Sequence, residues 1–457
     1  MIFNQGWHTF VLVGSEREWG LSGNGSGIPR LVGLGIFAVA VASGVYWGTD
    51  VVQGGDAPEY RRLAENILEG HGFSLSVGSP YEPTARRAPG YPLFLALVYT
   101  VFGRSDTAVL WAQSMLWGFG CLLLARLVAS IFDMRAGVLA AFIVAVHPVL
   151  ARTAGEVLTE SLYTVCMISL MFVFHRSLRT SSVLLLGFAG VLFGAATLIR
   201  PLTGAFLLFL WGGVWIWRQH LRSPVRSWLI MTAVGFLTLL PWTIRNSMVF
   251  GHFIPIQGVG AGVNVWLASL PYSDQPIVSW DEWDKALPRL QEKYPEMRVA
   301  AMVGRGDRPE HQTVLQLHGE RILMRAAIAR ILGDPLGYLR SRARSYPHLW
   351  LYSGGSSWLA EVSFGDAWRR GDLVRLTAKV LFLAVFSLLP IGLAVYSLIL
   401  EGLRREHYVL WAVPLLIAVV HVPLWIEYRY SIPAQPFLWG LASGAITSRL
   451  RRIAYRP

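Results

Sequence analysis

An acidic residue, Asp56, lies just beyond the first long apolar run of the sequence, in the stretch "GGDAPEYRRLAEN". Pro58 and Glu59 follow it at the spacing of a capping box, so the pattern predicts a helix that begins here with Asp56 as its N-cap. A carboxylate at a helix N-terminus also has its ionised form favoured by the helix dipole, which suits a general base or a cation ligand. The spacing leaves capping and chemistry both open for Asp56, and Tyr60 in the same stretch is a further candidate.

A second acidic residue, Glu160, lies in "ARTAGEVLTESLY", where one apolar segment ends and the next begins. Because an ionisable group is costly at the start of a membrane-spanning helix, Glu160 is by default a candidate for a functional site. Glu156 precedes it by four residues, so the two carboxylates are expected to share one face of a helix. Pairing of Glu160 with a nearby arginine for structural reasons is the alternative interpretation.

Four arginines stand at the ends of apolar segments on the side of the membrane where positive charge is disfavoured: Arg87, Arg200, Arg245 and Arg429. Guanidinium groups bind phosphate oxygens through paired hydrogen bonds, so four of them at one depth predict an anionic partner such as a lipid phosphate. Structural pairing with the acids on the same side is the competing interpretation. Tyr430 beside Arg429, and Asn264 in "GVNVWLAS", are further candidates on this side of the protein.

The composition is that of a protein with many membrane-spanning segments. Of its 457 residues, 54% are hydrophobic and only 15% are charged, whereas soluble domains carry about a quarter charged residues. The net charge of +12 comes mostly from arginines dispersed among apolar segments, so membrane topology explains it better than nucleic-acid binding does. Cys121 and Cys166 lie in apolar runs and provide neither a disulfide framework nor a metal motif.

The sequence predicts an all-α protein with about ten membrane-spanning helices, within a range of roughly nine to thirteen, because a span needs about 20 mostly apolar residues. The candidate segments are 31–49, 107–131, 136–151, 160–174, 182–199, 202–217, 227–248, 374–400, 408–426 and 431–447. Residues 90–102 are too short to cross and are predicted to form a helix at the membrane interface. Residues 319–345 are predicted to form an amphipathic helix on the outer surface, and residues 346–359 are expected to touch the membrane.

The arginines also predict how the chain is oriented in the membrane. Cytoplasmic connections carry an excess of Lys and Arg, and alternate connections of this chain fit that rule if both termini are cytoplasmic. Residues 1–30 and 448–457 are then cytoplasmic tails, and residues 31–447 form the transmembrane domain. The outer side receives a first loop at 50–106, with interfacial helices, and a large loop at 249–373. Any active site is therefore predicted to be built from outer loops and helix ends.

Six motifs follow one another along the outer side: "GGDAPEYRRLAENILEGHGF", "RRAPGYPLFLALVY", "LTESLY", "LIRP", "LPWTIRN" and "RYSIPAQP". Their order resembles that of the GT-C glycosyltransferases over roughly residues 31–440, in particular the group of protein O-mannosyltransferases and lipid A aminoarabinose transferases. The resemblance implies a GT-C-like fold and an enzyme that transfers a sugar from a polyprenyl-phosphate carrier to a glycan, lipid or protein acceptor. It also implies that the transfer takes place on the outer or lumenal side, without a nucleotide sugar.

The same resemblance implies roles for individual residues. Asp56 matches the first-loop catalytic acid, and Glu160 matches the second-loop acid. Positions near the donor phosphate are matched by Arg87, Arg200, Arg245, Arg429 and Tyr430. Direct displacement with Asp56 as the base would invert the anomeric carbon. A divalent metal held by Asp56 and Glu160 is compatible with this chemistry, but the sequence shows no dense cluster of ligands that would require a cofactor.

Two other classes of function stay open on the sequence alone. A flippase for polyprenyl-linked sugars would also use arginines near a lipid phosphate, but transporters place their sites near the midplane and often contain inverted repeats, and neither feature is found. A non-catalytic membrane assembly protein would not need acids at both Asp56 and Glu160. The favoured interpretation is an enzyme of the bacterial inner membrane with its active site outside the cytoplasm. Its expected partners are the lipid-linked donor, the acceptor and membrane lipids, but no nucleic acid.

Overall fold

The computed structural model describes most of the chain between residues 28 and 454. The described ranges are 28–49, 51, 53, 55–275, 280–305, 312–351, 362–402 and 404–454. Most of the predicted N-terminal tail, the last three residues of the predicted C-terminal tail and most of the segment 346–359 lie outside the described residues.

The described ranges are built from helices, as predicted, and the β-pairing within them is an isolated bridge between Ser74 and Pro83. Five helical runs are long and apolar enough to cross a membrane: α1 (Arg30–Gly48), α4 (Asp106–Ile131), α7 (Glu160–Thr180), α10 (Pro224–Phe250) and Leu373–Glu401. Shorter apolar helical runs are α3 (Gly90–Phe102), α5 (Met134–Val146), α8 (Val183–Ile199) and Pro201–Ile216, which ends in α9 (Phe206–Ile216). The chain is a multi-pass membrane protein with an all-α fold.

Several predicted spans are helical but interrupted. The segment 136–151 breaks at His147, because Pro148 has no backbone N–H for a continuing helix and instead starts α6 (Pro148–Arg152). The run 374–400 comprises α18 (Leu373–Leu383), a π-helical turn (Ala384–Leu388) and α19 (Leu389–Glu401). The last two spans are α20 (Tyr408–Val420), which ends before the predicted boundary, and a 3-10 helix η7 (Tyr428–Ala434) that continues as α21 (Gln435–Ala454).

The core of the membrane domain forms around α4, which packs against α1, α5 and α7. Trp117, Leu124 and Leu127 of α4 are completely or almost completely buried. Since lipid tails are as apolar as these side chains, close packing rather than water exclusion holds such helices together.

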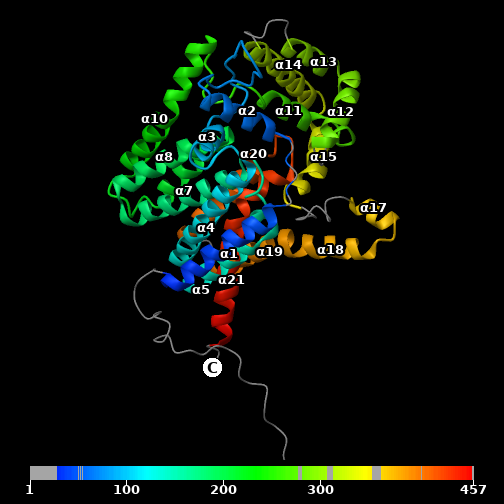
Figure 1. The fold of residues 1–457 in the computed structure, drawn as a ribbon. Coiled ribbons are helices and arrows are strands. Elements are labelled where there is room, and N and C mark those ends of the chain that lie inside the picture. The colour runs from blue at the N-terminus through cyan, green and yellow to red at the C-terminus, as the bar shows by residue number, and fades with distance from the viewer. Residues whose placement is uncertain are drawn as a thin grey trace, which may run out of the picture.

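The two loops predicted to lie outside the cytoplasm fold into further helices. The first loop contains α2 (Ala57–Leu68) and α3; the large loop contains α11 (Ala261–Ser269), α12 (Trp280–Lys293), α13 (Pro295–Arg305), α14 (Gln312–Gly333), α15 (Pro335–Ser345) and α17 (Phe364–Arg369). The predicted single helix at 319–345 is divided at Asp334 and Pro335, where the Asp334 carboxylate accepts from the Gly337 amide at 2.8 Å and caps α15. The helices α2, α3 and α11–α14 gather at one end of the protein, opposite the C-terminal end of α21 (Figure 1).

Candidate active site

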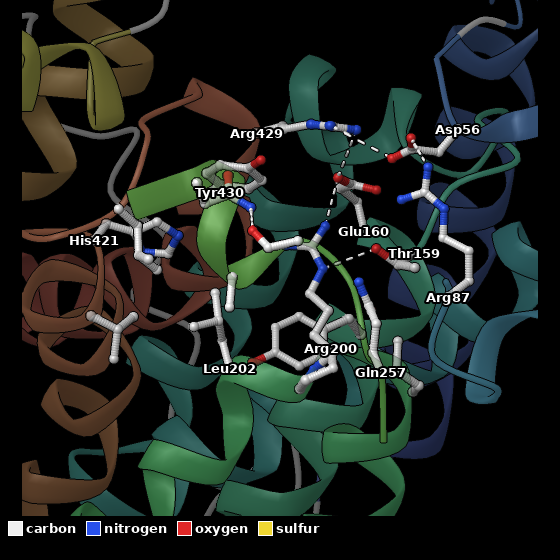
Figure 2. Close-up of a pocket in the computed structure, with 18 of the residues that line it drawn as sticks. Asp56, Arg87, Thr159, Glu160, Arg200, Leu202, Gln257, His421, Arg429 and Tyr430 are labelled. Atoms are coloured by element: carbon white, nitrogen blue, oxygen red, sulfur yellow. Dashed lines mark hydrogen bonds and ion pairs between the residues drawn. The ribbon is translucent and has the colours of Figure 1, made fainter. Parts of the chain in front are cut away.

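A cavity of about 410 Å³ lies where the first loop, the start of α7, the end of α8, the large loop and the segment after α20 meet. Its polar side chains are Asp56, Tyr60, Arg87, Thr159, Glu160, Tyr163, Arg200, Gln257, Asn264, His421, Arg429 and Tyr430. Its apolar wall is formed by Leu158, Ile199, Pro201, Leu202, Leu416, Ile417, Val420, Leu424 and Trp425. Figure 2 shows the acids and guanidinium groups turned toward one another inside this cavity.

Asp56 precedes α2, but its side chain does not cap that helix. Its backbone is already helical, at φ −82° and ψ −9°, and its carboxylate accepts no capping hydrogen bond. The prediction that the Asp56 and Glu59 side chains form a capping box is therefore wrong, because both carboxylates accept hydrogen bonds from Arg87 instead. Arg87 Nη2 donates to Asp56 Oδ1 at 2.5 Å, and Arg87 Nε donates to Glu59 Oε2 at 2.6 Å. Asp56 is 8% exposed and lines the cavity.

Arg87 and Tyr60 form the wall beside Asp56. The Arg87 guanidinium lies 5.6 Å from the centre of the Tyr60 ring. Burial lowers the pKa of Arg87, but the Asp56 carboxylate and the other anions around it outweigh burial and raise the pKa above its ordinary value. Burial raises the pKa of Tyr60 to about 12. Arg87 is therefore a fixed cation and Tyr60 a neutral phenol throughout the physiological pH range.

Glu160 is the first residue of α7 and is almost fully buried, with 1% of the residue exposed. Arg200 Nη2 lies 2.6 Å from Glu160 Oε1, and Arg200 Nε donates to Thr159 Oγ1 at 2.9 Å. The guanidinium also lies over the Tyr163 ring at 5.2 Å. Pairing with an arginine and a place in the cavity, which the sequence left as alternatives for Glu160, therefore occur together.

Glu156 does not share a helix face with Glu160, contrary to the prediction. It lies in the turn between α6 and α7, since α7 begins only at Glu160. Gly155 brings this turn against α1, because a Cβ added to Gly155 would lie 2.2 Å from the carbonyl oxygen of Gly48. Burial, and to a smaller extent the Glu160 carboxylate, raises the pKa of Glu156 to about 7. Glu156 is absent from the cavity lining.

Arg429 contacts both acids that line the cavity and a third buried acid beside it, Glu427. Its Nε donates to Glu427 Oε2 at 2.5 Å, its Nη2 lies 3.8 Å from Asp56 Oδ2, and its Nη1 lies 3.9 Å from Glu160 Oε1. Burial raises the pKa of Glu427, and the Arg429 charge opposes that rise. Arg87, Arg200 and Arg429 thus contact four carboxylates: Asp56 and Glu160, which line the cavity, and Glu59 and Glu427, which lie beside it.

The sequence analysis did not single out His421, which also lines the cavity. Its Nδ1 lies 2.9 Å from the carbonyl oxygen of Ile417, and its ring stacks on Tyr430 with centroids 5.1 Å apart. Because a carbonyl oxygen only accepts, Nδ1 carries the proton and Nε2 is an acceptor. Among the described residues, none hydrogen-bonds to this Nε2. A lone histidine after an apolar run gives no signal of such a role.

A glycine-containing loop, Gln257–Ala261, was also missed and lines another side of the cavity. The Gly258 amide donates to the Ala85 carbonyl at 2.9 Å, and the Trp425 amide donates to the Asn264 carbonyl at 3.0 Å. The loop is therefore hydrogen-bonded to the first loop, and α11, which follows it, is hydrogen-bonded to the segment after α20. The alternating glycines of "QGVGAGVN" were the available signal, and Gly260 adopts a positive φ of 117°.

Arg245 does not lie with the other three arginines. Its guanidinium donates to the Thr84 carbonyl at 3.0 Å and the Asn246 amide oxygen at 2.9 Å, and it packs on Phe73 and Trp242. It is absent from the cavity lining. The expectation that all four arginines lie together therefore does not hold for Arg245, which instead connects the first loop to α10.

The residues of the predicted metal site suit a divalent cation in type, but arginines already contact them. The carboxylates of Asp56 and Glu160 both face the cavity, and carboxylate oxygens suit a divalent cation. However, each already contacts a guanidinium group, and Arg429 lies between them. Within the described residues, no group of three or more His, Cys, Asp or Glu side chains is arranged to hold a metal. A bound cation would therefore have to displace part of the Arg429 contact.

Comparison with known proteins identifies a related sequence segment. Residues 86–244 match the family model described as dolichyl-phosphate-mannose-protein mannosyltransferase, which covers about a third of the chain. This segment contains Arg87, Glu160 and Arg200 of the cavity, whereas Asp56 and Arg429 lie outside it. No curated protein sequence gives a significant match to the chain.

Solved structures show a shared fold. The oligosaccharyltransferase AglB of Archaeoglobus fulgidus, in complex with an inhibitory peptide and a dolichol-phosphate, superposes with a TM-score of 0.53 at 13% identity, over 93% of this chain and 51% of that one. The same archaeal enzyme in complex with Zn and sulfate gives a TM-score of 0.52 at 14% identity, over 92% of this chain and 50% of that one. ArnT of Cupriavidus metallidurans, bound to undecaprenyl phosphate, gives 0.39 at 14% identity, over 92% and 78%.

The chain thus spans about half the length of the archaeal oligosaccharyltransferase that it matches. At these identities the superposition shows a common fold, and the ArnT superposition is too loose to add to it. The described helices and the archaeal superposition together show that the chain has the fold of the GT-C superfamily of membrane glycosyltransferases, with a central segment that resembles the dolichyl-phosphate-mannose-protein mannosyltransferases.

Proposed function

We propose that this protein is a membrane glycosyltransferase, which transfers a sugar from a polyprenyl-phosphate-linked donor to an acceptor outside the cytoplasm. The observation that carries the proposal is the cavity, in which the Asp56 carboxylate contacts the guanidinium groups of Arg87 and Arg429 and which also has an apolar wall. A lipid-linked sugar phosphate has complementary parts: hydroxyl groups, an anionic phosphate and an apolar chain. The shared fold supports the proposal, since the archaeal oligosaccharyltransferase was solved with a dolichol-phosphate.

Asp56 is the proposed catalytic base. Its carboxylate takes the proton of the acceptor hydroxyl while the hydroxyl oxygen attacks the anomeric carbon of the donor sugar. A bond forms from that oxygen to the anomeric carbon as the bond to the phosphate oxygen breaks on the opposite face, so the configuration inverts. A positioned base of this kind contributes roughly 10²–10⁴-fold to the rate. The 2.5 Å bond from Arg87 fixes the orientation of the carboxylate.

The arginines deeper in the cavity are proposed to stabilise the leaving group. The phosphate oxygen receives the electron pair of the broken bond, and its growing negative charge is stabilised by guanidinium groups that are already in place. Arg200 and Arg429 fit this role, because both line the cavity beside the apolar wall that includes Leu416 and Ile417. Glu160 is then a positioning residue that holds Arg200 through the 2.6 Å contact.

The proposed orientation places both termini in the cytoplasm and the cavity outside it. Arg451 and Arg452 lie in the last turn of α21, and this helix end is opposite the outer-loop helices (Figure 1). An excess of arginine at that end follows the usual bias of cytoplasmic segments.

Donor turnover by the purified full-length protein in nanodiscs tests the proposal. We would supply radiolabelled undecaprenyl-phosphate hexoses with an envelope extract as the source of acceptor, and measure the release of free undecaprenyl phosphate. Wild-type release that falls at least 100-fold in Asp56→Asn, with donor binding retained, is the expected result. Arg245→Gln is the matched control, because Arg245 lies outside the cavity, and it should release the lipid phosphate at a rate near that of the wild type.

Other outcomes of the same assay would redirect the assignment. Equal release by wild type and Asp56→Asn would remove Asp56 from the reaction. Movement of the intact donor across the bilayer by both proteins, without release, would indicate a flippase. Loss of release on adding a chelator, with recovery on adding a divalent cation, would assign a metal to the Asp56 and Glu160 carboxylates.

A further inference from the structure

The corner between α14 and α15 exposes apolar side chains in a loop that lies outside the predicted spans. Ile328, Leu332, Leu336 and Leu339 are all largely exposed, with Leu332 at 74% and Leu336 at 66%. We call residues 321–344 of these two helices the α14–α15 elbow. Exposed apolar residues that occur singly are ordinary, but a contiguous group marks a surface that contacts a partner or a membrane.

These side chains lie on one face of each helix. On α14, the exposed residues Arg321, Arg325, Ile328 and Leu332 are spaced four, three and four positions apart, which is the spacing of a single helical face. On α15, the exposed residues Leu336, Leu339 and Ala343 repeat the pattern. The opposite face of α15 carries Ser341, Arg342 and Ser345, which are buried. The exposed face is therefore distinct from the packed face.

The packed face of α15 holds the elbow against the end of α20. Arg342 Nε donates to the Val422 carbonyl at 2.8 Å, and its Nη2 donates to the carbonyls of His421 at 3.1 Å and Leu424 at 2.8 Å. Tyr346, which follows α15, donates to the Ala418 carbonyl at 2.7 Å. These acceptors are the last residues of α20 and those that follow it, so α15 lies at the C-terminal end of α20.

The exposed apolar surface of α20 ends next to α15. Leu415, Val419 and Val422 are exposed at helical spacing and form a stripe suited to lipid. Val422 at the end of this stripe accepts a hydrogen bond from Tyr338 of α15 at 3.5 Å. The packed face of α15 is therefore joined to the end of this exposed apolar stripe.

The charges on the elbow favour an anionic lipid surface over other occupants. Its exposed charged side chains are four arginines and one acid: Arg321, Arg325, Arg340, Arg344 and Asp334. The Asp334 carboxylate is used to cap α15. Helices that lie in the headgroup region combine apolar side chains with flanking arginines in this way, and such arginines attract anionic phospholipids.

We infer that the α14–α15 elbow lies in the headgroup region of the outer leaflet, with Leu332 and Leu336 at the boundary of the acyl chains and its arginines on anionic lipid phosphates. This inference concerns the membrane contact of the large loop and does not depend on glycosyl transfer. Through Arg342 the same contact steadies the backbone of His421 and Leu424, which line the cavity.

Lipid quenching of a fluorescent label tests the inference. The full-length variants Leu332→Cys and Leu336→Cys would be labelled with an NBD fluorophore in vesicles of phosphatidylcholine and phosphatidylglycerol that contain doxyl-labelled lipid. Leu237→Cys on the membrane helix α10 and Val299→Cys on α13 are the matched references for lipid and water, since both native side chains are exposed. The unmodified chain gives the background, with Cys121 buried and Cys166 partly buried.

Quenching at Leu332→Cys and Leu336→Cys of at least half that at Leu237→Cys, with a blue-shifted emission, is the expected result. Quenching as low as at Val299→Cys, with or without a blue shift, would overturn the inference and leave the elbow to water or to another protein surface. Replacing phosphatidylglycerol with phosphatidylcholine should reduce the quenching at least twofold. Unchanged quenching in the neutral vesicles would overturn the role given to the arginines.

Discussion

Replacing Arg429 with methionine is expected to destabilise the fold severely, because Arg429 contacts three buried acids: Glu427, and Asp56 and Glu160 of the cavity. Methionine keeps an unbranched apolar side chain but removes the charge. Glu427 would lose the donor at 2.5 Å, whereas Asp56 and Glu160 would lose only a cation at 3.8 and 3.9 Å. The last two acids keep Arg87 and Arg200 as closer partners, so most of the cost falls on Glu427.

The magnitude follows from the burial of Glu427, which is 4% exposed. Removing one partner of a buried ion pair typically costs about 3–5 kcal/mol, since the remaining charge stays buried without compensation. We expect a loss of this size in the free energy of unfolding for Arg429→Met. The double variant Glu427→Gln, Arg429→Met removes both charges and should recover more than half of the loss.

The loss in the free energy of unfolding of Arg429→Met should also depend on pH. Burial raises the pKa of Glu427 even beside Arg429, and removing that cation raises it further. The folded protein then holds a proton that the unfolded chain releases, so the penalty shrinks as the pH falls and grows as it rises. Unfolding by SDS titration and by heat in the same detergent, at pH 5 and pH 8, measures both effects.

Two results would refute this reasoning. A loss below about 1 kcal/mol would mean that Arg429 behaves as an exposed ion pair. A double variant as unstable as Arg429→Met would mean that the lost packing of the side chain, rather than the uncompensated Glu427 charge, is responsible. Glu160→Gln combined with Arg429→Met is the matched control and should recover much less, because Glu160 retains Arg200.

Three further predictions follow from single side chains. Because the pKa of Glu156 is raised from 4.5 to about 7, the stability of the wild type should fall as the pH rises through that window, and Glu156→Gln should abolish this fall in unfolding midpoints measured from pH 4 to 8; an unchanged slope would place the titrating group elsewhere. Arg245→Met should cost about 1.5–3 kcal/mol of stability through its lost hydrogen bonds while leaving the affinity for undecaprenyl phosphate unchanged, and a tenfold loss of that affinity would return Arg245 to the lipid-phosphate site. His421→Phe keeps an aromatic ring to stack on Tyr430 but removes the Nε2 acceptor, so KM for donor or acceptor should rise about five- to tenfold with little change in kcat, as expected for one lost hydrogen bond; unchanged kinetics would make His421 purely structural.

The helices were predictable because their signal is local. Each apolar run carries its own length and composition, so all ten predicted segments are helical in the structure. Their ends were less predictable where a proline divides a run, as at Pro148 and Pro335. The large loop gave charged, helix-like stretches, but its packing on α20 depends on Arg342 contacts with backbone carbonyls, which leave no pattern in a sequence.

The sequence indicated which acids and arginines were candidates for the site, but it did not indicate which acid pairs with which arginine. Asp56, Glu160 and three of the four arginines do meet in one cavity, because acids and arginines at outer helix ends are unusual in a membrane protein. Which arginine meets which acid is decided by tertiary packing, and so the sequence could not separate Arg245 from the others. The local sequence at Asp56 fits a capping box, but in the structure the Asp56 carboxylate accepts from Arg87, which is 31 residues away in the sequence.

The carboxylates that contact the three arginines of the cavity bear on how a turnover would end. In the proposed reaction the donor is a phosphodiester with one negative charge, whereas the released lipid is a phosphomonoester that ionises further. Arg87, Arg200 and Arg429 already contact four carboxylates, those of Asp56, Glu59, Glu160 and Glu427, so these arginines have no spare positive charge for that second ionisation. The cluster would therefore hold the product less tightly than a purely cationic site would, and this relative weakness favours product expulsion and the entry of the next donor.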